Sequence, residues 1–129
     1  MEFDLLKGKE GEIQEAEFCE RDLLKFLEAI GEDNALYKKE KILPPTFFTI
    51  MRKGRQDHGI KSKVMLHGSQ EYEIKRLPKL GEKISYKTKI KDIYEKEGKK
   101  GKMLFVVYES EYHSGEEIIG VGRSILIFM

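Results

Sequence analysis

The chain has little of what would hold a metal ion or form a disulfide. Of its 129 residues one is cysteine, Cys19, three are histidine and none is tryptophan. A single cysteine cannot close an internal disulfide, and so few Cys and His residues do not suit the usual tetrahedral zinc site. We therefore expect a reducing, intracellular setting, with no metal and no other cofactor.

Excess charge and long apolar runs are also missing. The 24 basic and 23 acidic residues leave a net charge of +1, which gives no broad electrostatic reason to expect nucleic acid or an anionic membrane as partner. No stretch approaches the ~20 apolar residues that span a bilayer, and the first residues lack a basic region followed by an apolar run. We expect a soluble, cytoplasmic protein, and the length suits one domain over residues 1–129.

The clearest predicted element is a helix over residues 20–30. Its apolar residues recur at i, i+3, i+4 and i+7 and form one stripe. They are Leu23, Phe26, Leu27 and Ile30. Gly31 follows at the position where a left-handed residue ends a helix.

A second helix is expected to begin at Pro45, because proline loses no hydrogen bond in a first turn. Its apolar residues indicate a largely buried element. They are Phe47, Phe48, Ile50 and Met51. Gly54 or Gly59 is expected to end it.

From residue 64 onward the apolar residues recur every second position. In residues 84–91 each alternate residue is apolar or Thr and the others are Ser or Lys, which predicts a strand with one solvated face. Similar patterns lie in residues 64–74, 103–112 and 117–129. Four long strands joined by short turns favour an antiparallel meander. Strict alternation places His67 on the polar face of its strand, with Met65, Ser69 and Glu71.

Two helices followed by four strands predict the α+β class, with a twisted antiparallel sheet that curls around one apolar helix. Such a sheet has exposed edges, which commonly pair with a second chain. We therefore expect association.

Four segments, in this order, carry a resemblance that covers nearly the whole chain. They are residues 26–37 (FLEAIGEDNALY), 43–47 (LPPTF), 66–72 (LHGSQEY) and 77–82 (LPKLGE). The chain resembles the MaoC-like hotdog domains, and most closely the N-terminal half of their dehydratase members. The resemblance implies a hotdog fold.

Active members of that family are (R)-specific enoyl-thioester hydratases or 3-hydroxyacyl dehydratases. Their chemistry needs a carboxylate and an imidazole that hold one water and move its protons, placed by an Asp-x-Asn-Pro-x-His loop. It also needs a backbone amide at the start of the central helix, which binds the thioester oxygen as negative charge develops.

On that loop, this sequence has Glu32 at the Asp position, Asn34 at the Asn, Ala35 at the Pro and Tyr37 at the His. The imidazole is missing, and tyrosine, with an ordinary pKa near ~10, transfers protons poorly near neutrality. The position of the amide donor falls on Pro45, which has no N–H. Losing one such donor raises a barrier by about 3 to 4 kcal/mol. The resemblance therefore implies a hotdog that has lost its catalytic pair.

In the same family, two-chain dehydratases pair such a hotdog with one that keeps the pair, and the inactive half shapes the acyl tunnel. The resemblance thus implies an accessory subunit that binds the acyl thioester of coenzyme A or acyl carrier protein. Its partner would be a second hotdog chain, in a heterodimer or homodimer. The implied substrate-binding residues are Pro45, Thr46, Phe47, Ile50, Met51, His67 and Gln70.

Alternatives remain open for each weak catalytic candidate. Glu32 and Asn34 are polar residues that commonly cap a loop through its backbone, and Tyr37 can pack against the next helix. His67 can be an ordinary hydrogen-bonded strand residue. For the chain as a whole, the alternatives are a self-sufficient hydratase or thioesterase that uses Glu32, and a non-enzymatic acyl-binding module.

Overall fold

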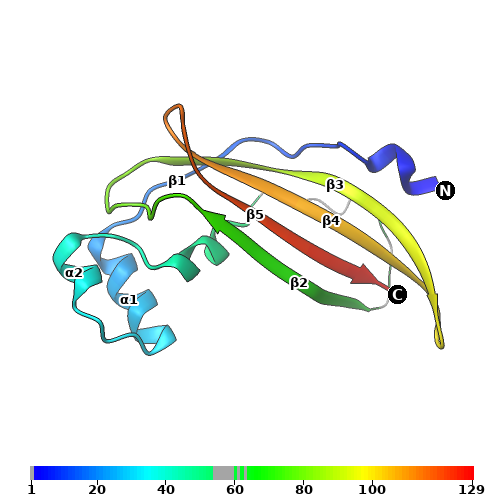
Figure 1. The fold of residues 1–129 in the computed structure, drawn as a ribbon, viewed down its shortest axis with the longest axis horizontal. Helices are drawn as coiled ribbons and strands as arrows, with labels where there is room; N and C mark the ends of the chain where they lie inside the picture. The colour runs from blue at the N-terminus through cyan, green and yellow to red at the C-terminus, as the bar shows by residue number, and fades with distance from the viewer. Residues whose placement is uncertain (1, 54–59, 61, 63) are drawn as a thin grey trace.

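A computed structural model describes residues 2–53, 60, 62 and 64–129. It contains a five-stranded antiparallel sheet in the order β1-β3-β4-β5-β2. The sheet is long and curved, and α1 (Glu20–Ile30) and α2 (Leu36–Glu40) lie together at one end of it (Figure 1). The strands are β1 (Gln14–Ala16), β2 (Met65–Ile74), β3 (Ile84–Gly98), β4 (Gly101–Ser114) and β5 (Glu117–Phe128).

The predicted meander is correct for β3, β4 and β5 and wrong for β2. β2 pairs with β5 and not with β3. The segment between β2 and β3 does not close a hairpin, because its backbone is bonded to other parts of the chain. Lys79 bridges to Ile42, and the Gly81 N–H donates to the carbonyl of Phe18. β2 is therefore an edge strand at the far side of the sheet.

The first helix, α1 (Glu20–Ile30), has the predicted bounds. Its first turn is closed by the Asp22 carboxylate, which accepts a hydrogen bond of 2.8 Å from the Cys19 N–H. Gly31 ends it with φ of 71° in the left-handed region, which glycine adopts without strain. Ile30, the last residue of the predicted apolar stripe, is 45% exposed.

The second predicted helix is a short 3-10 helix, η2 (Pro45–Ile50). The glycines expected to end it, Gly54 and Gly59, lie outside the described residues. Phe47 packs against α1, whereas Phe48 packs against the sheet. The element was expected to be largely buried; Phe47, Phe48 and Met51 are buried, but Ile50 is 44% exposed. η2 therefore lies between α1 and the sheet and contacts both through apolar side chains.

Three short elements were not predicted: η1 (Glu2–Leu6), α2 (Leu36–Glu40) and β1. η1 packs its half-buried Phe3 and Leu6 onto one end of the core. β1 adds three residues to the edge of β3. Neither carries the apolar periodicity of a long element, which is why the pattern did not reveal them.

The two faces of the sheet differ in composition. One face, here called the inner face, carries the alternate residues of β3 that include Ile84, Tyr86, Thr88 and Ile90, and it packs against η2. The other, the outer face, carries Ser85, Lys87 and Lys89. The solvated face predicted for this strand is confirmed.

Candidate functional site

The loop at residues 32–37 uses its polar side chains locally. The Glu32 carboxylate accepts a hydrogen bond of 3.0 Å from the Asn34 N–H. The Asn34 side-chain oxygen accepts one of 3.0 Å from the Leu36 N–H, at the start of α2. Both side chains therefore act as caps of their own loop. Their catalytic role stays a prediction.

Tyr37 is half-buried against the apolar cluster of Leu23, Leu27, Leu43 and Phe47. The side chain at this position, where the resemblance predicts the histidine of active members, packs into the core around α1. Pro45 begins η2 and supplies no N–H donor there.

A cavity of about 260 Å³ lies on the inner face of the sheet. Its lining brings together three of the predicted substrate-binding residues, Met51, His67 and Gln70. The other predicted residues, Pro45, Thr46, Phe47 and Ile50, are not part of this lining. Phe47 is fully buried on the side of η2 that faces α1, whereas Ile50 is exposed.

A β-bulge between His67 and Ser69 shapes the cavity. Because Gly68 is the extra residue, His67 lies opposite Leu126 and Gln70 lies opposite Ser124, both on the inner face. Strict alternation had placed His67 with Ser69 and Glu71, and this expectation was wrong. The His67 ring nitrogen Nε2 lies 3.0 Å from the Ser69 carbonyl oxygen, so the bulge also fixes the ring.

A band of hydroxyl groups crosses the floor of the cavity and was not predicted. Thr88 and Ser124 are the buried polar residues of the described chain. The Thr88 Oγ1 lies 2.6 Å from the Ser110 Oγ on the neighbouring strand. These residues lie at inner-face positions of β3, β4 and β5. The alternation within each strand therefore indicates the face on which each of them lies.

Two tyrosines of the cavity, Tyr72 and Tyr112, have a raised pKa and therefore stay protonated near neutral pH. Burial raises the pKa of Tyr112, whose hydroxyl donates a hydrogen bond of 3.2 Å to the Met51 carbonyl. Burial also raises the pKa of Tyr72. Gly122 makes room for both rings, since a Cβ there would lie 2.8 Å from Tyr72 and 3.3 Å from Tyr112. Neither tyrosine is suited to act as a base near neutral pH.

The outer face carries charged side chains in cross-strand pairs. Glu109 contacts Arg123 at 2.7 Å and Lys91 at 2.9 Å. Burial alone would raise the pKa of Glu109, but these two cations hold it below its ordinary value. The His113 Nε2 lies 2.9 Å from the Glu111 carboxylate. This imidazole–carboxylate pair faces away from the inner cavity.

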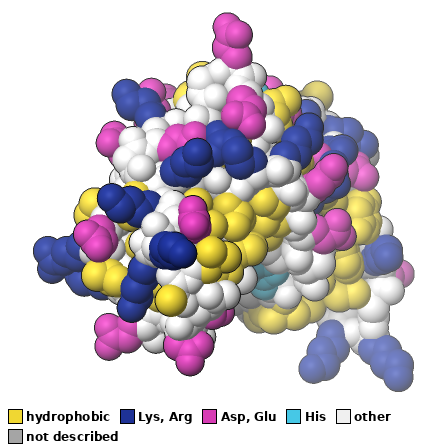
Figure 2. All heavy atoms as spheres, turned by 60° about the vertical axis from the view of Figure 1, so that its left-hand side comes forward, with side chains coloured by type: hydrophobic (Ala, Val, Ile, Leu, Met, Phe, Trp, Pro, Cys, Tyr) yellow, Lys and Arg dark blue, Asp and Glu magenta, His cyan; other side chains and the backbone are white. Residues whose placement is uncertain are grey.

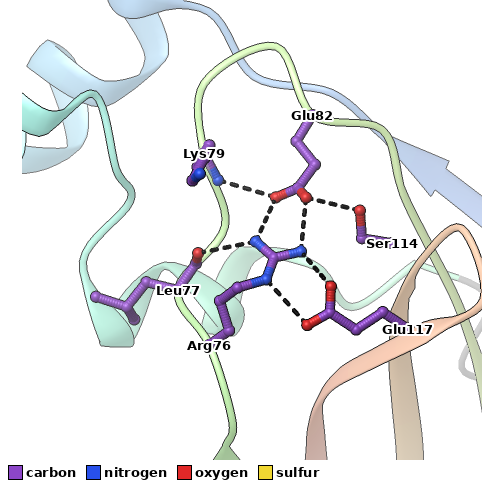
Figure 3. A network of polar contacts seen from close by, with 6 residues as sticks. All are labelled: Arg76, Leu77, Lys79, Glu82, Ser114 and Glu117. Atoms are coloured by element: carbon purple, nitrogen blue, oxygen red, sulfur yellow. Dashed lines mark hydrogen bonds and ion pairs between the residues drawn. The ribbon is translucent and has the colours of Figure 1, made fainter.

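An ionic network ties the end of β2 to the following turn and to the β4–β5 turn (Figure 3). The Arg76 guanidinium donates two hydrogen bonds to Glu82, at 3.0 and 2.7 Å, and two to Glu117, at 3.2 and 3.1 Å. Glu82 also accepts bonds from the Ser114 hydroxyl and the Lys79 N–H. We call these residues the Arg76 network. Arg76 holds the pKa of Glu82 at about 2.

Within residues 2–53, 60, 62 and 64–129, no group of three His, Cys, Asp or Glu side chains is placed to hold a metal ion. None of the helices in that part of the chain is both long and apolar enough to cross a membrane.

A curved antiparallel sheet that packs its inner face on a short apolar helix is the hotdog fold. In comparisons with known proteins, residues 6–120 match the family described as FAS1-like, dehydratase domain region. The chain therefore belongs to this family of dehydratase domains. No curated protein sequence matches it.

Solved hotdog structures share the fold at low sequence identity. A chain of the HadBC (3R-hydroxyacyl-ACP dehydratase) complex from Mycobacterium tuberculosis matches with a TM-score of 0.77 and 16% identity, over 95% of this chain and 96% of that one. A chain of the ChsH1–ChsH2 complex from the same organism gives 0.76 and 14%, over 93% and 88%. The (R)-hydratase from A. caviae involved in PHA biosynthesis gives 0.73 and 11%, over 95% and 96%. The first two of these structures are complexes.

Proposed function

We propose that this chain is the accessory, tunnel-forming subunit of an (R)-specific enoyl-thioester hydratase or 3-hydroxyacyl dehydratase. The observation that carries the proposal is the loop at residues 32–37, where Glu32 and Asn34 bond to their own backbone. Neither described histidine bonds to that loop, since His67 contacts Ser69 and His113 contacts Glu111. On this proposal, the proton-transferring pair of the family comes from a partner chain.

The partner would dock along β2. This strand pairs on one side with β5 and forms the edge of the sheet. Three apolar side chains at its start are exposed: Val64 at 44%, Met65 at 55% and Leu66 at 46%. An exposed strand edge with apolar side chains is a template for pairing with another chain.

The helical end offers a second apolar surface. Figure 2 shows hydrophobic side chains gathered near the middle of this view, with charged side chains around them. Leu24, Ile30, Leu36 and Ile50, from α1, α2 and η2, are all more than 40% exposed. A partner hotdog could cover part of this surface as well as the edge.

The test reconstitutes the enzyme. The purified chain is mixed with a hotdog chain that keeps the Asp-x-Asn-Pro-x-His loop, first the product of the adjacent reading frame, and hydration of crotonyl-CoA is followed. We expect the mixture to be at least tenfold faster than either chain alone. Leu66→Lys should abolish the gain by placing a charge on the docking edge, whereas Leu5→Lys, on the exposed η1, should keep it. Equal rates with and without this chain would contradict the proposal.

A further inference from the structure

The outer face of the sheet carries apolar side chains that belong to none of the core clusters of the described residues. They alternate along β3, β4 and β5 with buried inner-face residues and are partly exposed. We call them the outer-face patch, which consists of Tyr94, Phe105, Val107, Ile125 and Ile127. Contiguous apolar side chains on a solvated face commonly mark a contact with another protein.

The outer-face patch is continuous across the sheet, because its residues are neighbours in register. Tyr94 lies opposite Phe105, and Phe105 lies opposite Ile127. The rings of Tyr94 and Phe105 stack with their centroids 5.1 Å apart. In the adjacent row, Val107 lies opposite Ile125. Apolar side chains therefore cover the outer face of the middle strands over two rows.

Two charged rows cross the same face beside the outer-face patch. Read from β2 to β3, the first row is Glu71, Arg123, Glu109 and Lys89. The second row, in the same direction, is Glu73, Val121, Glu111 and Lys87. Charges alternate along the first row, so that reading it from the other edge gives the opposite charge at every position. Both rows begin with an acidic residue on β2 and end with a basic residue on β3.

A face with this pattern is complementary to itself about a two-fold axis that runs parallel to the strands, between β4 and β5. Such an axis places β2 of one copy over β3 of the other, and β5 over β4. Phe105 of one copy then faces Ile127 of the other. In the first charged row, Glu71 faces Lys89 and Glu109 faces Arg123. An axis across the strands would instead place the basic edge of one copy over the basic edge of the other, which is unfavourable.

We propose that the outer-face patch and the two charged rows form a docking surface for a second copy of this chain, packed sheet on sheet about the axis parallel to the strands. Aligned sheets pack about 10 Å apart with their strands within about 30° of each other, and the side chains of the two facing surfaces fill the space between them. This inference does not depend on the proposed function, because the inner cavity lies on the other side of the sheet. Leu66, opposite Ile127 on β2, belongs to both proposed surfaces and so does not distinguish them.

Sedimentation of the purified full chain over a series of concentrations measures the self-association. Ile125→Lys places a charge in the middle of the outer-face patch, and we expect it to weaken self-association about 30-fold or more, as the loss of a residue central to an interface does. Leu5→Lys, the same kind of change on the exposed η1, should leave self-association unchanged. Thermal unfolding of each variant shows whether it is folded.

Two results of this experiment would overturn the inference. One is an unmodified chain that stays monomeric at every concentration. The other is equal self-association of the unmodified chain and a folded Ile125→Lys variant. Self-association along the edge of β2 alone would give this second result, and it would leave the proposed function standing.

The charged rows allow a test that does not alter the apolar patch. Glu71→Lys and Lys89→Glu each place like charges over one another at both ends of the first row. Each should therefore weaken self-association about 5- to 10-fold at low salt. Each variant supplies the charge that the other has lost, so labelled Glu71→Lys should bind Lys89→Glu as tightly as the unmodified chain binds itself.

The control for this pairing is Lys79→Glu, which changes charge by the same amount at an exposed position outside the rows. Labelled Glu71→Lys should bind Lys79→Glu more weakly than it binds Lys89→Glu. Equal binding to these two variants would show that Glu71 and Lys89 do not face each other and would overturn the inference, even if Ile125→Lys fails to fold.

Discussion

In the loop at residues 32–37, the Glu32 and Asn34 side chains each bond to a backbone amide two residues further along the chain. In the Arg76 network, one guanidinium joins groups that lie 6 and 41 residues away in sequence. The loop resembles a catalytic motif in sequence, yet its bonds shape only itself. The network matches no catalytic motif, yet it fixes the turns at one end of the sheet. Residue types alone therefore do not show which side chains hold distant parts of the fold together. The sequence separation of the residues that they contact does show it.

Removing the centre of the network should give the largest loss of stability. Arg76→Ala leaves Glu82, which is 19% exposed at its side chain, without its main cation. We expect the free energy of unfolding to fall by about 2 kcal/mol, measured by urea denaturation. Lys75→Ala, an exposed neighbour, is the control and should change it little. Equal effects of the two substitutions would show that the network does not stabilise the fold.

Acid should weaken the network through Glu82. Its pKa is about 2 in the folded protein, against an ordinary 4.5, so the unfolded chain binds the proton more tightly. The stabilisation is complete above about pH 4.5 and is lost as the pH falls toward about 2. Glu82→Gln should therefore reduce the fall in unfolding free energy between about pH 5 and pH 3. An unchanged pH profile in this variant would contradict the role of Glu82.

The ion pair between Arg76 and Glu117 should contribute less to stability than the pair between Arg76 and Glu82. The Glu117 carboxylate is 57% exposed at its side chain, and exposed ion pairs contribute about 0 to 1 kcal/mol. We expect Glu117→Gln to lower the unfolding free energy by less than about 1 kcal/mol, and less than Arg76→Ala does. Glu116→Gln, which removes the same charge one residue away, is the matched control. A loss of unfolding free energy as large as that of Arg76→Ala would show that Glu117, and not Glu82, is the main partner of Arg76.

The loop should give the smallest effects. Asn34→Ala removes one cap of the short helix α2, and we expect a loss of about 0.5 to 1 kcal/mol. Tyr37→Phe keeps the packed ring and should change neither stability nor activity in the reconstituted enzyme. A large fall in turnover for Tyr37→Phe, with unchanged stability, would assign the hydroxyl a catalytic role.

The parts of the fold that depend on neighbours in sequence were predicted well. The spacing of Leu23, Phe26 and Leu27 gave α1 its bounds, and Gly31 ended it as expected. The solvated face of β3 followed from alternation alone. These features depend on residues within one or two turns of each other, which a pattern can report.

The parts that depend on distant contacts were missed. The position of β2 beside β5 is set by pairing across the sheet, and nothing within β2 indicates it. The bulge at Gly68 moves His67 and Gln70 onto one face, which strict alternation forbids. Alternation in β3 places Thr88 among apolar residues on one face of the strand, but Ser124 joins it only once β5 is placed in the sheet. The candidate site was therefore predicted in part.

The most direct measurement is the rate of crotonyl-CoA hydration by the chain alone, purified free of other hotdog proteins, beside its Glu32→Gln variant. If the proton-transferring pair belongs to a partner, the two preparations give the same rate, which equals the uncatalysed rate in buffer. Turnover by the unmodified chain at enzymatic speed, lost in Glu32→Gln, would show that this loop catalyses and would contradict the account.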